Sequence, residues 1–260
     1  MPDVSWLALS AALVLVVVAV GLSFWRRLGL EQSIAWAAVR AAVQLLAVGA
    51  VLAWLLDPGR SLVWSWCWVG VMLVTAAVIV RSRAPEIPGV VLMALEAFGA
   101  ALVVALSVLF GLGIFELEAI TLIPLAGLTI GNAMAATVLV ARRIYDGIRD
   151  QQAEVEARLA LGQRSSEAAR PYVRRALRTA LVPQIETTKA VGLVLLPGTM
   201  TGLILAGVEP WEAVKVQLAV MYLVLGATAT TTTVIAMGVQ RRLFTRDHRL
   251  IRMPRTADTG

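Results

Sequence analysis

An uncharged stretch at residues 120–140 reads ITLIPLAGLTIGNAMAATVLV, and the arginine-rich ARRIYDGIRD follows it directly at residues 141–150. The hydrocarbon core of a bilayer is about 30 Å thick, so a helix rising about 1.5 Å per residue needs about 20 apolar residues to cross it. An apolar run of this length that ends in arginines is typical of a membrane-spanning helix. We therefore predict an integral membrane protein.

Six further apolar stretches have a similar length, and the composition of the chain agrees with them. Apolar residues make up 59% of the sequence and charged residues 15%, whereas a soluble domain has about 25% charged residues. We predict an all-α, polytopic membrane protein that forms one membrane domain over residues 1–260. Its seven transmembrane helices are expected at residues 4–24, 34–56, 62–80, 90–110, 120–140, 187–206 and 213–239.

The positive charge of the chain is arginine charge, and it gathers in alternate connections between the predicted spans. Lys and Arg number 23 against 17 Asp and Glu, and only Lys189 and Lys215 are lysines. The arginines cluster in three alternate connections and in a basic tail at residues 241–260. Because connections rich in Lys and Arg stay in the cytoplasm, we predict an N-terminus outside and a C-terminus in the cytoplasm.

Several function classes are excluded by residue types that the chain lacks. Cys67 and His248 are its only cysteine and histidine, so one chain cannot build a disulfide framework or a Cys/His metal cluster. Nucleic-acid binders carry basic residues on a polar surface, whereas these arginines border apolar runs, so we expect lipid and no nucleic acid as a partner. A phosphate-binding loop needs glycine before its lysine, but the lysines follow Thr188 and Val214. We therefore expect a transport protein rather than an enzyme, with no nucleotide bound through that motif.

The longest connection, residues 142–186, is polar and has helical periodicity. Apolar residues recur at three- and four-residue spacings between charged ones, and Gly162 suits the end of a first amphipathic helix. A second, basic helix is expected to follow, interrupted by Pro171 and ended near Pro183. These two helices can lie on the anionic leaflet, or they can dock a cytoplasmic partner.

The C-terminal half carries motifs that resemble a known family. They are Gly131-Asn132-Ala133, Glu156-Ala157-Arg158 with Gly162, Leu196-Pro197-Gly198-Thr199-Met200-Thr201-Gly202, and Leu205-Ala206-Gly207 with Pro210. The second motif is similar to the Glu-Ala-Ala loop through which the membrane subunits of ABC transporters dock on their ATPase. Together the motifs resemble the bacterial iron-export ABC permease family, which includes plant aluminium-tolerance membrane proteins. The chain departs from that family at Thr199 and Leu203, where methionine and glutamine are frequent.

The resemblance implies a permease subunit in the bacterial inner (plasma) membrane that exports a metal ion such as iron. Two permease copies would work with two copies of a cytoplasmic ABC ATPase, and ATP and magnesium would be bound by that partner. No cofactor is implied for this chain itself. The implied docking residues are Glu156, Ala157, Gly162, Arg170 and Arg174.

Polar and sulfur-containing side chains within the spans are candidates for a transport pathway. Glu96 lies about two turns from the end of its span and is our preferred membrane acid, with a packing ion pair to Arg40 as an equal alternative. Glu186 and Lys189 are three residues apart, which favours an ion pair near the membrane surface. The other candidates are Gln44, Asn132, Met134, Met200 and Gln217, although helix packing is the more frequent use of such side chains. No set of metal ligands can be assigned.

Two pairs of glycines, each four residues apart, predict close helix approach in the spans that flank the long connection. They are Gly127 with Gly131 and Gly198 with Gly202. Pro197 precedes the second pair and permits a bend there. We expect these glycines to act as hinge or packing positions.

Two other function classes stay open at this stage. A secondary transporter or channel that needs no nucleotide would be expected to show paired repeats, and we see none in the sequence. An integral-membrane enzyme would need a catalytic group of residues, and His248 on the basic tail has no evident partner.

Overall fold

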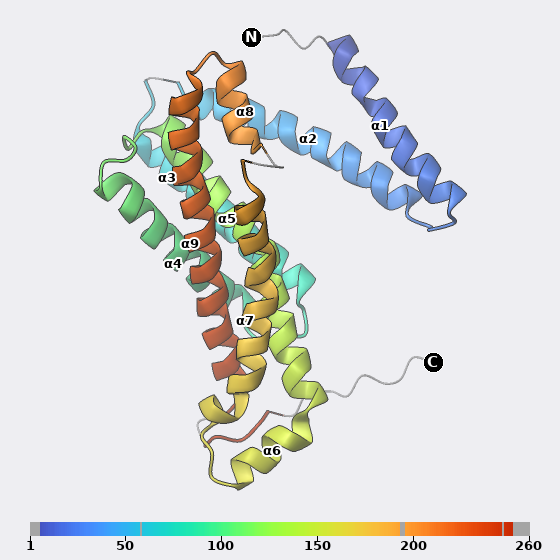
Figure 1. Ribbon diagram of the computed structural model, residues 1–260, viewed down its shortest axis with the longest axis vertical. Coiled ribbons are helices and arrows are strands. Elements are labelled where there is room, and N and C mark those ends of the chain that lie inside the picture. The colour runs from blue at the N-terminus through green and yellow to red at the C-terminus, as the bar shows by residue number, and fades with distance from the viewer. Residues whose placement is uncertain (1–5, 58, 193–195, 246, 252–260) are drawn as a thin grey trace. The chain divides into compact units, whose positions relative to one another are not determined.

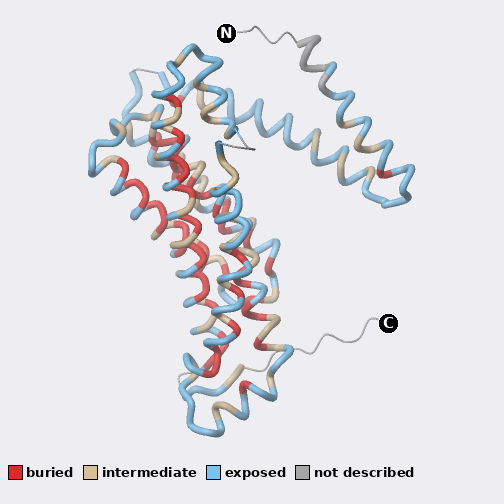
Figure 2. The backbone as a smooth tube through the Cα atoms, in the orientation of Figure 1, coloured by how far each residue is buried: buried red, intermediate tan, exposed pale blue. Residues whose placement is uncertain are grey.

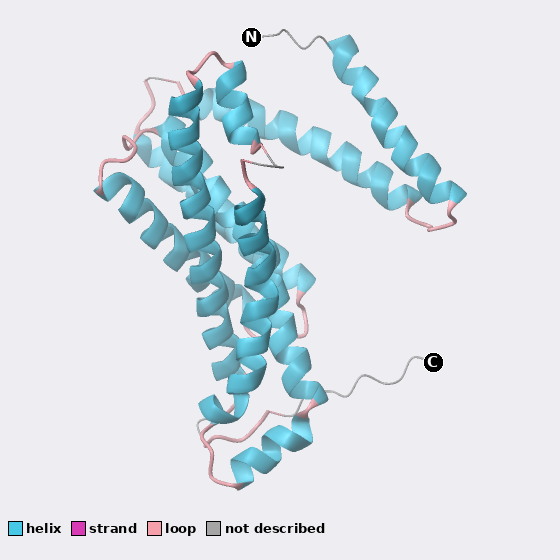
Figure 3. Cartoon of the chain, viewed as in Figure 1, coloured by secondary structure: helices cyan, strands magenta, loops and turns pink. Residues whose placement is uncertain are grey.

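The computed structural model describes residues 6–57, 59–192, 196–245 and 247–251. Within these ranges every regular element is an α-helix, and no strand is formed (Figure 3). The all-α prediction is therefore confirmed. The chain divides into two units, residues 1–61 and 62–260, which we describe separately.

The first unit is a pair of helices, α1 (Trp6–Trp25) and α2 (Glu31–Leu55). The turn between them places Arg27 and Gly29 at positive φ. Ser23 fixes the turn, because its hydroxyl donates to Glu31 Oε1 at 2.9 Å and accepts from the backbone N–H of Leu30 at 3.3 Å. Most side chains of α2 are exposed, as expected for an apolar helix that meets lipid.

The second unit is a bundle of long helices. Its members are α3 (Leu62–Arg83), α4 (Val90–Gly111), α5 (Ala119–Asp150) and α9 (Pro210–Arg242), with α7 (Ser165–Ala190) lying along α5 and α9 (Figure 1). Two short helices, α6 (Gln152–Ala160) and α8 (Gly198–Leu205), complete it. Buried residues follow the contact faces of α4, α5 and α9 (Figure 2).

The packing of α4 on α9 depends on a glycine. A Cβ atom at Gly238 would lie 2.9 Å from the Sδ atom of Met93 and 3.0 Å from its Cγ atom. Real side chains do not approach so closely, so a larger residue would require the side chain of Met93 to shift. Gly226 lies nearer the start of α9. A Cβ atom there would meet no atom within 4 Å, so a larger side chain at Gly226 would meet no clash.

Five helices are long and apolar enough to cross a membrane: α2, α3, α4, α5 and α9. The described apolar part of α1, Leu13–Trp25, is shorter. The prediction of a polytopic membrane protein is confirmed by these helices. The orientation of the two termini and the limits of the predicted domain stay predictions.

The predicted sixth span, residues 187–206, is not one helix. Its first residues belong to the end of α7, and its last ones form α8. Between them Val191 is extended and Gly192 has a φ of +89°, and Pro197 is extended as the N-cap of α8. Proline cannot donate a backbone hydrogen bond and Gly192 is left-handed, so the helix ends before the apolar run does.

Candidate functional site

A helical projection at one end of the second unit follows the membrane-crossing part of α5. Beyond the apolar run, α5 continues through Arg142 and Arg143 to Asp150, and α6 then turns back toward α7. Val155 of α6 is fully buried, and the chain leaves α6 through Gly162 at a φ of +85°. The predicted amphipathic first helix and its glycine end are therefore confirmed.

The second helix of this projection is longer than predicted. α7 is continuous from Ser165 to Ala190 and contains both Pro171 and Pro183, so the predicted interruption and the predicted end near Pro183 are wrong. A proline inside a helix costs about 3 kcal/mol. The helix is held by the face that it buries, which is formed by Ala168, Ala169, Tyr172, Ala176 and Ala180, while both prolines stay exposed.

A hydrogen-bonded group joins α6 to α7. Glu154 accepts from Arg158 Nη2 at 2.6 Å and from the hydroxyl of Tyr172 at 3.0 Å. The hydrogen bond from Arg158 lowers the pKa of Glu154, with a smaller lowering from Tyr172. Burial raises the pKa of Tyr172, and its hydrogen bond to Glu154 adds to the rise. Glu154 therefore supports the contact in its charged form and Tyr172 in its neutral form.

Tyr172→Phe should loosen α6 from α7, because it removes the hydroxyl that Glu154 accepts. We expect tryptic cleavage at Arg164, in the exposed connection between the two helices, to become several-fold faster than in the parent chain. The contact should also weaken as the pH falls through the lowered pKa of Glu154, or as it rises through the raised pKa of Tyr172. Tyr222→Phe, at an exposed position of α9, is the control, and equal cleavage of both variants would contradict this role.

Three of the predicted docking residues lie in α6 and in the turn that follows it. Glu156, Ala157 and Gly162 are all exposed, and Glu156 accepts only from Gln152 of its own helix, at 2.7 Å. Leu161 lies among them with 83% of its surface exposed. The sequence analysis did not single out Leu161. A leucine directly before the glycine that ends a polar helix could have indicated an exposed apolar contact residue. An exposed apolar side chain at the tip of a projection is suited to contact a protein partner, because the contact would remove its surface from water.

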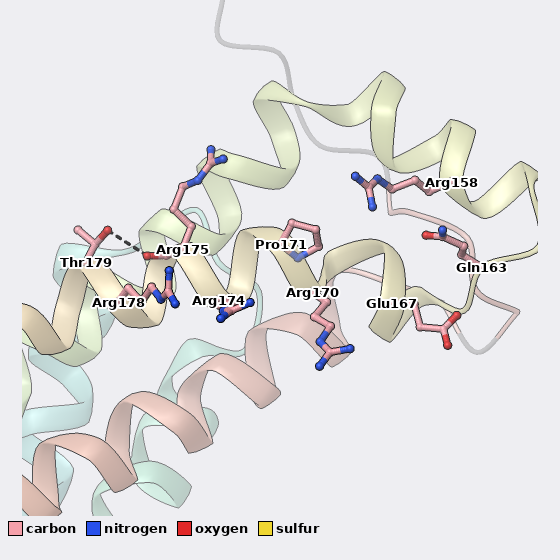
Figure 4. A pocket seen from close by; sticks show the side chains of 9 residues that line it. All are labelled: Arg158, Gln163, Glu167, Arg170, Pro171, Arg174, Arg175, Arg178 and Thr179. Carbon is pink, nitrogen blue, oxygen red and sulfur yellow. Dashed lines mark hydrogen bonds between the residues drawn. The ribbon is translucent and has the colours of Figure 1, made fainter.

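Arginines form the side of the projection next to these residues. Arg158 of α6 and Arg170, Arg174, Arg175 and Arg178 of α7 surround an open cavity of about 960 Å³ (Figure 4). Within the described part of the chain, the four arginines of α7 take part in no ion pair. The predicted residues Arg170 and Arg174 thus belong to a larger basic surface, which suits an acidic partner surface or anionic headgroups.

The predicted pathway residues are distributed over several helices of the two units. Gln44 is exposed on α2, whereas Arg40 and Glu96 lie in different units and are exposed on α2 and α4. Asn132 is exposed on α5 and donates to the carbonyl of Leu128 at 2.9 Å. Their place in a pathway stays a prediction.

The remaining pathway candidates differ in their burial. Met134 and Met200 are half-buried, on α5 and α8. Gln217 of α9 is 5% exposed, and its Oε1 atom has no hydrogen-bond partner among the described residues. A buried amide oxygen without a partner is unfavourable by about 1–3 kcal/mol, so Gln217 is the one candidate whose side chain the bundle leaves unsatisfied. Among the described residues no group of three or more His, Cys, Asp or Glu side chains could hold a metal ion.

The glycine pairs have open space around them in the single chain. A Cβ atom at Gly131, Gly198 or Gly202 would meet no atom within 4 Å, and one at Gly127 would meet only the end of Met72, at 3.0 Å. Among the described residues of the second unit, no side chain or neighbouring helix therefore closes on Gly131, Gly198 or Gly202. Their role in close packing stays a prediction.

The tail after α9 is partly ordered by the start of α7. His248 Nδ1 lies 2.9 Å from Ser165 Oγ and 3.4 Å from its backbone nitrogen. The tail also folds back on itself, with Ile251 N–H donating to the carbonyl of Leu243 at 3.0 Å. The expectation that His248 has no partner is wrong, because the chain turns back after Arg242 rather than running free. Residues 252–260 of the predicted tail lie outside the described residues.

Comparison with known proteins places these features in a family. The model of the uncharacterised protein family UPF0014 matches residues 6–244. The chain is 36% identical to the rice protein named UPF0014 membrane protein STAR2, over 85% of this chain and 78% of that protein. It is 32% identical to the Probable iron export permease protein FetB of Escherichia coli, over 94% of both chains. It is also 32% identical to Protein ALUMINUM SENSITIVE 3 of Arabidopsis thaliana, over 93% of this chain and 88% of that protein.

No solved structure matches the chain significantly, so the family assignment comes from sequence. The matches extend over nearly the whole chain, including the N-terminal unit. They confirm the resemblance on which the sequence interpretation drew. The chain is therefore a multi-pass membrane protein that belongs to the uncharacterised protein family UPF0014.

Proposed function

We propose that this chain is the transmembrane subunit of an ABC transporter that exports a metal ion such as iron. A separate cytoplasmic ATPase, which binds ATP and magnesium, supplies the energy. The observation that carries this proposal is the projection formed by α6 and the first half of α7. It extends beyond the charged end of α5, and it presents an exposed leucine beside a basic surface.

The continuity of α7 gives the projection a mechanical use. Its 26 residues span about 39 Å at about 1.5 Å per residue, from the arginine surface to the broken crossing before α8. A partner that pushes on α6 therefore moves one end of a single helix whose other end lies in the membrane. Helix shifts of this kind are a known means of coupling two distant sites.

The metal substrate is supported by similarity rather than by a ligand set. The relative from Escherichia coli is named a probable iron export permease, and the described residues hold no cluster of metal ligands. Two permease copies with two ATPase copies would form the complex, with the N-terminus outside and the C-terminus in the cytoplasm.

The test of this proposal is co-purification. The tagged chain, extracted from its native membrane in mild detergent, should retain an ABC ATPase in a one-to-one ratio. An ATPase encoded beside the gene for the chain is the first candidate. Recovery of the chain with no ATPase, from membranes that contain the candidate, would count against the proposal.

A further inference from the structure

An ion pair lies on the exposed side of α7 shortly before this helix ends. Lys189 Nζ is 2.9 Å from Glu186 Oε1, and the two side chains are 67% and 61% exposed. Thr187 between them is exposed too. The sequence interpretation placed this pair near the membrane surface, on the assumption that a span begins at residue 187.

The packing of α7 on α5 places the pair much deeper. The two helices run in opposite directions (Figure 1), and a Cβ atom at Gly147 of α5 would lie 3.5 Å from Tyr172 of α7. From that level, Glu186 is about 14 residues or 21 Å further along α7, whereas the charged end of α5 at Arg143 is only about 6 Å away in the same direction. Glu186 therefore lies about 15 Å inside the charged boundary, at the centre of a core about 30 Å thick.

Hydrocarbon cannot be the environment of this face. A charged side chain at the centre of a bilayer is strongly unfavourable, and such residues face protein or a water-filled cavity. The backbone gives a second, independent argument, because α7 ends at Ala190 and is followed directly by Val191 in an extended conformation and Gly192 at a φ of +89°. Non-helical backbone at this depth is tolerated only where it is buried in protein or lines water.

Other polar groups occur at the same depth. Asn132 is exposed on α5, about 15 Å inside Arg142 by the same rise per residue. Thr187 donates its hydroxyl to the carbonyl of Pro183 at 2.9 Å, so its oxygen keeps the capacity to accept a hydrogen bond. Helix breaks that combine free backbone groups with polar side chains are where transporters bind their solutes.

We propose that the Glu186–Lys189 pair lines a water-filled section of the transport pathway at the centre of the membrane. The solute that passes it is a hydrated, charged species rather than a lipid or an apolar compound, because both charges of the pair face it. The inference rests on the proposed transport function and names the kind of solute that it serves. Dry packing of this face against other helices, of the first unit or of a second copy, is the competing arrangement.

Cysteine labelling separates water from dry packing. In a chain with Cys67→Ala, Thr187→Cys and Val103→Cys each carry one thiol, the latter on an exposed apolar position near the middle of α4. A membrane-impermeant, positively charged methanethiosulfonate reacts with the ionised thiol, which forms only in water. Thr187→Cys should react at least about tenfold faster than Val103→Cys in native membranes. Equally slow labelling of both would overturn the proposal in favour of dry packing.

The charges themselves are tested by neutral replacements that keep polarity. Glu186→Gln combined with Lys189→Gln should lower ATP-dependent transport about tenfold or more, while the ATPase stays bound at its distant projection. Unchanged transport would overturn the role of the pair. Failure of the proposed transport function gives a different result, because the parent chain would then bind no ATPase. The labelling of Thr187→Cys does not require the ATPase, so it still tests whether this face is in contact with water.

Discussion

Leu161→Asp should weaken binding of the partner ATPase about 30-fold or more. Leu161 is the most exposed large apolar residue at the tip of the projection, with 83% of its surface free. Truncating a central apolar anchor of an interface costs about 2 kcal/mol or more, and placing a carboxylate there adds a desolvation penalty. Retention of the ATPase on the immobilised, detergent-solubilised chain measures the effect.

A matched control for this substitution is Leu112→Asp. Leu112 has 74% of its surface exposed, but it precedes α5 whereas Leu161 follows it, so the two leucines lie at opposite ends of a 32-residue helix. Leu112→Asp should leave ATPase binding unchanged. If both variants bound as the parent does, the projection would not be the docking site.

Gly198→Leu and Gly202→Leu should each abolish transport while leaving ATPase binding intact. Neither glycine has an atom within 4 Å of its Cβ position among the described residues, so leucine meets no clash within the second unit, and we expect both variants to fold. Glycines spaced four residues apart let helices of different copies approach closely, and α8 is the element that directly follows the broken crossing. Leucine would block that approach.

The control for the glycine variants is Gly226→Leu, which also has open space around it but lies on α9. It should transport at the parent rate. Transport is measured as ATP-dependent movement of ferrous iron, and binding as retention of the ATPase. Normal transport by Gly198→Leu would contradict a role of α8 in transport.

Much of the fold could be predicted from the sequence, because lipid imposes a simple length rule on apolar runs. The runs that became α3, α4 and α9 have the expected character, and so does the apolar part of α5. The sixth span could not be predicted in the same way. Pro183, Glu186 and Lys189 suggest the end of a surface helix, and the depth that we propose for them rests on the packing of α7 along α5 and α9.

The candidate site could be predicted only where its residues are close together in the sequence. Glu156, Ala157 and Gly162 belong to a linear motif, so their nearness in space follows from their nearness in the sequence. The arginines of α7 could be found from charge, but their arrangement around one cavity depends on how α6 folds back. The contact of His248 with Ser165 joins residues that are 83 positions apart in the sequence. A local sequence pattern cannot predict such a long-range contact.

The central claim is that this chain moves a metal ion at the expense of ATP hydrolysed by a docked partner. Uptake of ferrous iron into inside-out membrane vesicles that contain both proteins tests it most directly, because export from the cell becomes uptake in this geometry. Our account predicts uptake that requires ATP and the ATPase and is lost with Leu161→Asp. Iron uptake that proceeds without nucleotide, or that an ion gradient alone drives, would contradict the account and indicate a secondary transporter or channel.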